Sequence, residues 1–148
     1  MSILVTGASR GIGLNIVRTF LQTQPTKKVI AACRNPSGAD ALIKLKQEHS
    51  DRLTIETLDV KEEESIKELV KKLHESHTTL SVLINNAGIY SGMEKETLLN
   101  STKHSMLTVY ETNVVAPMLL IQHLYNEKCF EQNGLIATIS SVMGSIGT

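Results

Sequence analysis

The sequence has 148 residues, of which 41% are hydrophobic and 20% are charged, and this composition predicts one globular domain with a sizeable core. Fifteen basic and fifteen acidic residues balance, so the net charge gives no reason to expect a nucleic acid or a membrane as partner. The first strand is predicted near the N-terminus, which leaves no room for a secretion signal, and the two cysteines show no disulfide or metal pattern. We therefore expect a cytoplasmic protein.

The first predicted strand, residues 3–5, leads into a glycine-rich loop, Thr-Gly-Ala-Ser-Arg-Gly-Ile-Gly at 6–13, and a helix at 14–21. Glycines placed between a first strand and a first helix are typical of dinucleotide-binding proteins, because they permit a tight turn, close approach to a pyrophosphate and close helix packing. The helix start also favours an anion. The candidate cofactor residues in this loop are Gly7, Ser9, Arg10, Gly11, Ile12 and Gly13.

The remaining predicted strands and helices alternate. Strands are expected at 29–33, 53–58, 80–84 and 135–140, and helices at 39–49, 62–75 and 101–130, the last with a kink at Pro117. Short connections between them imply right-handed crossovers and a parallel sheet. The predicted fold is a Rossmann-type α/β domain over residues 1–148, a doubly wound three-layer sheet with strand order 3-2-1-4-5, which binds ligands at the carboxyl ends of its strands.

The end of the second predicted strand indicates which nicotinamide cofactor fits. NAD-binding proteins of this type carry an acidic residue about twenty positions after the last glycine, where it binds the ribose 2′-hydroxyl. Here that position is Cys33, and Arg34 follows it. Arg34 and Arg10 could together bind a 2′-phosphate, so NADP (NADPH) is predicted in preference to NAD. The alternative is that both arginines are solvated loop residues.

Four later motifs also follow predicted strands or lie in the long helix: Asp59, Asn85-Asn86-Ala87-Gly88, Asn113 and Ile139-Ser140-Ser141. Together with the glycine loop, they make the whole sequence resemble the classical short-chain dehydrogenases/reductases. Three short sequence segments, at 33–35, 112–117 and 140–146, resemble the C-factor-like and sniffer-like carbonyl reductases of this family.

The resemblance implies roles in cofactor binding for residues after the third and fourth strands. Asp59 would accept a hydrogen bond from the adenine amino group and Val60 would flank the ring, and the alternative for Asp59 is a helix N-cap. The cofactor ribose would be lined by Asn86, Ala87 and Gly88. Asn85 would brace the central sheet by bonding neighbouring backbone.

The resemblance implies catalytic roles for two residues. Asn113 would hold a local helix distortion and a water of the proton relay, whereas the alternative is an asparagine on the helix surface. Ser141 would hydrogen-bond the carbonyl oxygen of a small substrate and stabilise the developing alkoxide, whereas the alternative is a serine that caps its own loop.

The sequence departs from the family in its general acid, a tyrosine with a lysine four residues later. The residues found at that spacing after its three tyrosines are Glu94, Val114 and Cys129. We expect a fold truncated after strand five and a chain that is inactive alone. The intact protein is expected to be an NADPH-dependent carbonyl reductase that transfers hydride to a ketone or aldehyde. In that intact form it could assemble as a homo-oligomer. The alternative is a non-catalytic form that binds a nucleotide or a protein partner.

Overall fold

The computed structural model describes residues 1–90 and 99–141, and its described strands form one sheet. All neighbouring strands are parallel, and their order is β3-β2-β1-β4-β5, as predicted. The strands are β1 (Ser2–Thr6), β2 (Lys28–Cys33), β3 (Leu53–Thr57), β4 (Leu80–Asn85) and β5 (Phe130–Thr138). The order reverses between β1 and β4, so the carboxyl ends of these strands are where a ligand site is expected.

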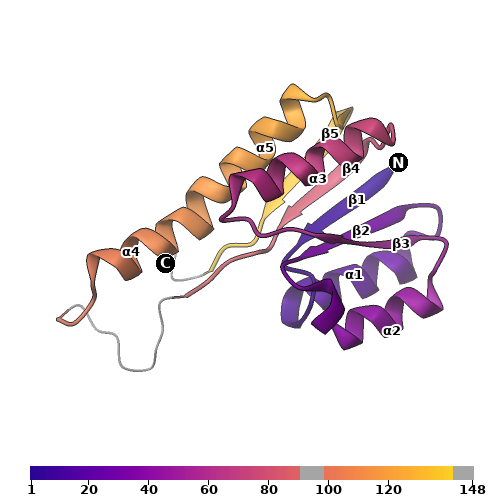
Figure 1. Ribbon diagram of the computed structural model, residues 1–148. Helices are drawn as coiled ribbons and strands as arrows, with labels where there is room; N and C mark the ends of the chain where they lie inside the picture. Colours follow the sequence, from indigo (N-terminus) through magenta and orange to yellow (C-terminus); the bar gives the residue numbers. More distant parts are fainter. Residues whose placement is uncertain (91–98, 142–148) are drawn as a thin grey trace.

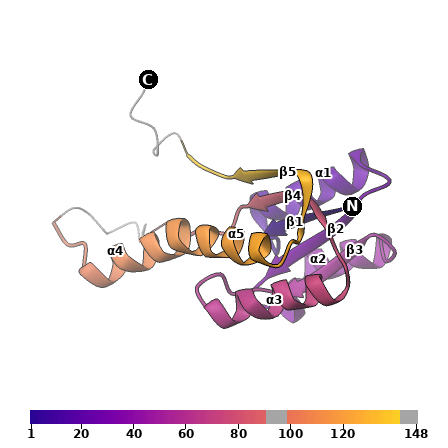
Figure 2. The ribbon, with the colours of Figure 1, turned by 90° about the horizontal axis from the view of Figure 1, so that it is seen from above.

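Helices cover both faces of the sheet (Figure 1). One face carries α1 (Gly11–Thr23) and α2 (Asp40–Glu48), and the other carries α3 (Glu63–Glu75) and α5 (Ala116–Asn126). The helix α4 (Lys103–Tyr110) extends beyond the sheet, as the view from above shows (Figure 2). Among the described residues, no helix combines the length and the apolar character needed to cross a bilayer.

Strand alternation separates the buried side chains into two cores. Ile3 and Val5 pack with α1 and α2, whereas Leu4 between them packs with α3 and α5. Residues on both faces of β1 are buried, which explains why the first strand is a continuous apolar run. The sheet therefore holds the loop after β1 in a fixed position relative to both helical layers.

The long helix begins at Lys103 rather than at residue 101, and it carries a distortion around Asn113, as the resemblance implied. It is interrupted at η2 (Glu111–Val115), a π-helical turn in which the Ala116 N–H donates to the Glu111 carbonyl five residues earlier. This distorted turn directly precedes Pro117, where the kink was predicted. Because Pro117 has no N–H to donate to the carbonyl of Asn113, the chain cannot continue its ordinary α-helical bonding through this turn.

The predicted end of this helix at residue 130 was also wrong. Lys128 adopts φ 55 and its N–H bonds the Tyr125 carbonyl, while the Cys129 N–H bonds the Leu124 carbonyl. These bonds form a Schellman motif, which ends α5 at Asn126 and leads directly into β5. The strand β5 itself begins earlier than predicted and contains a register shift, between the pairs Leu80–Phe130 and Val82–Leu135.

Arg52 connects the start of β3 to the end of α1. Its Nη2 donates to the Leu21 carbonyl at 2.9 Å and its Nη1 to the Gln24 carbonyl at 3.2 Å. Helix carbonyls at this end have no intrahelical partner, and a cation there also interacts favourably with the helix dipole. We expect Arg52→Ala to lower the free energy of unfolding by about 1–2 kcal/mol, measured by urea denaturation.

The matched control for Arg52→Ala is Arg18→Ala. Arg18 is exposed and, among the described residues, bonds only Asn15 of its own helix, at 3.3 Å, so its loss should change the free energy of unfolding by less than about 0.5 kcal/mol. Equal effects of the two substitutions would contradict a capping role for Arg52.

Candidate functional site

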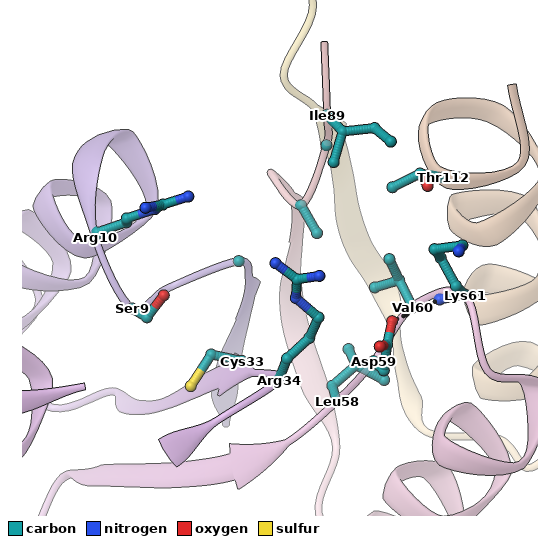
Figure 3. A pocket seen from close by; sticks show the side chains of 13 residues that line it. Ser9, Arg10, Cys33, Arg34, Leu58, Asp59, Val60, Lys61, Ile89 and Thr112 are labelled. Atoms are coloured by element: carbon teal, nitrogen blue, oxygen red, sulfur yellow. Dashed lines mark hydrogen bonds between the residues drawn. The ribbon is translucent and has the colours of Figure 1, made fainter. Parts of the chain in front are cut away.

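A cavity of about 150 Å³ lies at the carboxyl ends of β1, β2, β3 and β4. Figure 3 shows the side chains around it. Its lining residues are Gly7, Ser9, Arg10, Cys33, Arg34, Leu58, Asp59, Val60, Lys61, Ala87, Gly88, Ile89 and Thr112. The cavity thus brings together eight of the fourteen predicted site residues, from four segments that lie far apart in the sequence.

The glycine loop is fixed to the end of β4 by reciprocal hydrogen bonds. Thr6 Oγ1 accepts from the backbone N–H groups of Asn86 and Ala87 at 3.1 and 3.0 Å. In return, Asn86 Nδ2 donates to the carbonyls of Thr6 and Gly7 at 2.9 and 3.1 Å. The bracing expected of Asn85 is therefore performed by Asn86, whereas Asn85 Nδ2 is buried without a hydrogen-bond partner in the part of the chain that the structure describes.

The three glycines of the loop meet different requirements. Gly7 has φ 64, and a Cβ there would lie 2.8 Å from the Cα of Ala87. Gly13 packs directly on the loop, because a Cβ there would overlap the Gly7 carbonyl oxygen and come within 2.5 Å of Asn86 Nδ2. Gly11 has φ 58 and faces open space. This leaves the backbone at Gly11 accessible, and its role in the approach of a phosphate stays a prediction.

Two arginines border the cavity. Arg34 projects from the end of β2 into the space between the glycine loop and the segment that carries Asp59 and Val60 (Figure 3). Both Arg10 and Arg34 are exposed, and neither forms an ion pair or side-chain hydrogen bond with another residue that the structure describes. Both guanidinium groups can therefore bind an anion without first breaking an existing ion pair.

The end of β2 adds no negative charge to this cavity. Cys33 is buried, and burial raises the pKa of its thiol, although a hydrogen bond from the backbone of Asn35 acts in the opposite direction. The thiol is therefore neutral at pH 7. The structure confirms that Cys33 and Cys129 are free, buried side chains.

Asp59 is the carboxylate among the lining residues. Its Oδ1 accepts from the Lys61 N–H at 3.1 Å, and its own N–H donates to Ser65 Oγ at 3.0 Å. The N-cap of α3 is Glu62, so the alternative in which Asp59 caps that helix was wrong. The structure fixes the direction of the Asp59 side chain through the turn before α3. Its role toward adenine stays a prediction.

Asn113 lies in the π turn and binds both backbone groups of one residue. Its Oδ1 accepts from the Ile89 N–H at 2.8 Å and its Nδ2 donates to the Ile89 carbonyl at 2.7 Å. Ile89 lines the cavity, whereas Asn113 does not. The amide of Asn113 thus holds the segment after β4 against the distorted helix, while its side chain stays exposed on the helix surface. Its role toward a water of the proton relay stays a prediction.

These two bonds predict a local effect of Asn113 substitutions. Asn113→Ala should lower the free energy of unfolding by about 1–3 kcal/mol and speed hydrogen exchange at the Ile89 amide. Asn113→Asp keeps an acceptor for that amide but cannot donate to the Ile89 carbonyl. We therefore expect slower exchange at Ile89 in Asn113→Asp than in Asn113→Ala. Equal exchange rates in the wild type and Asn113→Ala would contradict the proposed contact.

Ser141 lies beyond β5, which ends at Thr138, two residues before the predicted end. The Ile139 N–H still pairs with the Asn85 carbonyl at 2.9 Å, so the chain leaves the sheet beside β4. Ser141 is exposed and is not part of the cavity lining. Residues 142–146 of the segment 140–146, which contributed to the resemblance, lie outside the described residues.

Sequence reasoning missed several residues of the site. Thr6 had a signal, since it is a polar residue that ends an apolar strand and is 1% exposed. Lys61 directly follows the predicted Asp59-Val60 pair. Leu58, Ile89 and Thr112 had no such signal, because only tertiary packing brings them to the cavity.

Comparison with known proteins gives a consistent result. A family model described as short chain dehydrogenase matches residues 1–148. The chain is 33% identical over 154 residues to the NADP-dependent 3-hydroxy acid dehydrogenase YdfG of Escherichia coli, covering 98% of this chain and 56% of that protein. This chain thus spans about half the length of the curated relatives that it matches.

Two solved structures are also similar over 98% of this chain. The NADPH-bound carbonyl reductase from chicken fatty liver has a TM-score of 0.85 and 39% identity, with 61% of that chain covered. A carbonyl reductase from Pseudomonas aeruginosa PAO1 in complex with NADP has a TM-score of 0.88 and 30% identity, with 63% of that chain covered.

Proposed function

The chain belongs to the short chain dehydrogenase family, and on this premise we propose that it binds NADP(H), in preference to NAD(H), at the carboxyl ends of its strands. The observation that carries the proposal is the pair of arginines, Arg10 and Arg34, which have no partner among the described residues and lie beside a strand end without a carboxylate. The names of two similar structures, which describe bound NADPH and NADP, support it.

The residues present fit such a cofactor. The cavity of about 150 Å³ is smaller than the roughly 300–1,000 Å³ of typical ligand pockets, so it would receive only one end of the dinucleotide. Arg34, Asp59 and Val60 mark that end as the adenosine 2′-phosphate. Arg34 and Arg10 would pair with the phosphate. Oδ1 of Asp59 already accepts a hydrogen bond from the Lys61 backbone N–H, so Oδ2 would accept the hydrogen bond from the adenine amino group.

The activity that we propose for the protein is NADPH-dependent reduction of a ketone or aldehyde. When bound, the cofactor supplies the hydride. Ser141 would donate a hydrogen bond to the substrate carbonyl and stabilise the charge that develops on its oxygen. Asn113 would keep Ile89, and with it the segment after β4, in place beside the cofactor.

A second candidate, nucleotide binding without turnover, is favoured by one feature of the sequence. None of the three tyrosines has a lysine four residues later, so these 148 residues lack the proton donor pair that the family uses. We propose that this chain binds NADPH without reducing a carbonyl by itself.

The test is a titration of the purified 148-residue chain with NADPH and with NADH, followed by cofactor fluorescence and calorimetry. We expect a Kd for NADPH that is lower by at least about tenfold, which corresponds to roughly 1.4 kcal/mol. Dicarbonyl reduction is measured in the same samples. NADPH binding without turnover would support the second candidate, whereas failure to bind NADPH would refute both.

A further inference from the structure

The turn that follows Arg34 is held by the side chain of Asn35. Asn35 Oδ1 accepts from Ser37 Oγ at 2.8 Å and from the Gly38 N–H at 3.3 Å. Asn35 thereby caps η1 (Pro36–Gly38), a single 3₁₀ turn between β2 and α2. The turn is closed further by the Ala39 N–H, which donates to the Pro36 carbonyl at 3.2 Å.

Backbone constraints act on both sides of Asn35. Pro36 fixes its own φ and disfavours helical geometry at the preceding residue, and Asn35 adopts φ −130 and ψ 87. On the other side, Cys33 is the last residue of β2, and its carbonyl accepts from the Leu58 N–H at 2.9 Å. Arg34 is thus the single residue between a fixed strand end and a fixed turn.

This placement matters because the Arg34 guanidinium has no partner within residues 1–90 and 99–141. No hydrogen bond or ion pair with a described residue holds the side chain in the cavity. The backbone at residue 34, and hence the turn that follows, sets the direction in which the Arg34 side chain leaves the main chain. A cation whose backbone is already ordered loses less conformational entropy when it binds an anion.

We propose that Asn35 is a positioning residue that directs Arg34 toward the 2′-phosphate of NADP and so sets the preference for NADP over NAD. Asn35 acts through its bonds to Ser37 and Gly38 and does not itself contact the cofactor. This inference rests on the proposed function, because it deepens the account of cofactor choice at the same site.

The test compares the Kd for NADPH with the Kd for NADH in the 148-residue chain and its variants. Asn35→Ala should raise the Kd for NADPH about three- to tenfold and leave the Kd for NADH within about twofold, because only NADPH carries the phosphate that Arg34 binds. Gly38→Ala should act in the same direction, since a Cβ there would lie 2.8 Å from Asn35 Nδ2 and displace the amide. Asn126→Ala, at the exposed end of α5, is the matched control and should leave the ratio unchanged.

The two variants perturb the same turn from opposite sides, so Gly38→Ala decides the question if Asn35→Ala does not fold. A loss of affinity that is equal for both cofactors would indicate a merely structural role and overturn the inference. If the wild type prefers NADPH and the variants keep the same ratio of the Kd for NADPH to the Kd for NADH, the inference is also overturned, while the proposed function stands. A wild-type chain that does not prefer NADPH would instead refute the proposed function.

Discussion

Replacement of Gly13 by alanine should lower the melting temperature by about 4–10 °C and abolish NADPH binding. The new Cβ would meet the Gly7 carbonyl oxygen and Asn86 Nδ2. Neither atom is free to move away, because one belongs to the backbone and the other donates two hydrogen bonds at the end of β1. Overpacking of this kind costs about 2–3 kcal/mol and would shift the glycine loop away from α1. Circular dichroism melting and an NADPH titration measure both effects.

Gly11→Ala is the matched control, because it introduces the cost of a positive φ without steric overlap of the new Cβ. Nothing lies within 4 Å of a Cβ at Gly11, but its φ of 58 is unfavourable for alanine by about 1–2 kcal/mol. We expect a smaller loss of melting temperature, about 2–5 °C, together with weaker NADPH binding, since the Cβ would occupy the approach to the loop. A larger thermal effect at Gly11 than at Gly13 would contradict the packing argument.

The sequence was sufficient to predict the sheet because its signals are local and repeated. Continuous apolar runs marked the strands covered on both faces, and the glycine loop identified β1 and α1, so the strand order followed from crossover rules. The α4–α5 region was harder. The left-handed conformation of Lys128 and the π turn at Glu111–Val115 depend on backbone bonds that a helical hydrophobic pattern does not record.

The sequence predicted which types of residue form the site more accurately than it predicted what each residue does there. Asn85 and Asn86 are adjacent and identical in chemistry, so the sequence alone could not distinguish which amide reaches the carbonyls of Thr6 and Gly7. That choice depends on which way the chain turns as it leaves β4. Lys61 lines the cavity from the turn before α3, and Thr112 lines it from η2. These two segments come together only because α3 packs beside α5.

Arg34→Met should raise the Kd for NADPH about 10- to 100-fold and leave the Kd for NADH within about twofold. A hydrogen bond to a charged group contributes about 1.5–3 kcal/mol, which corresponds to this range. Methionine retains much of the aliphatic length but removes the charge. Because Arg34 is exposed and has no partner among the described residues, its loss leaves no carboxylate unpaired, and the melting temperature should change little.

Arg18→Met is the matched control, since Arg18 is an exposed arginine on α1 whose side chain bonds Asn15 of the same helix. It should leave both dissociation constants unchanged. A variant in which both Arg34 and Arg10 are replaced by methionine tests whether the two side chains bind the same phosphate. If they do, the effects of the single substitutions on the free energy of NADPH binding will not be additive. If Arg34→Met weakened NADH as much as NADPH, Arg34 would act on a part common to both cofactors. The cofactor preference would then have to originate at Arg10, on the opposite side of the cavity from Asp59 and Val60.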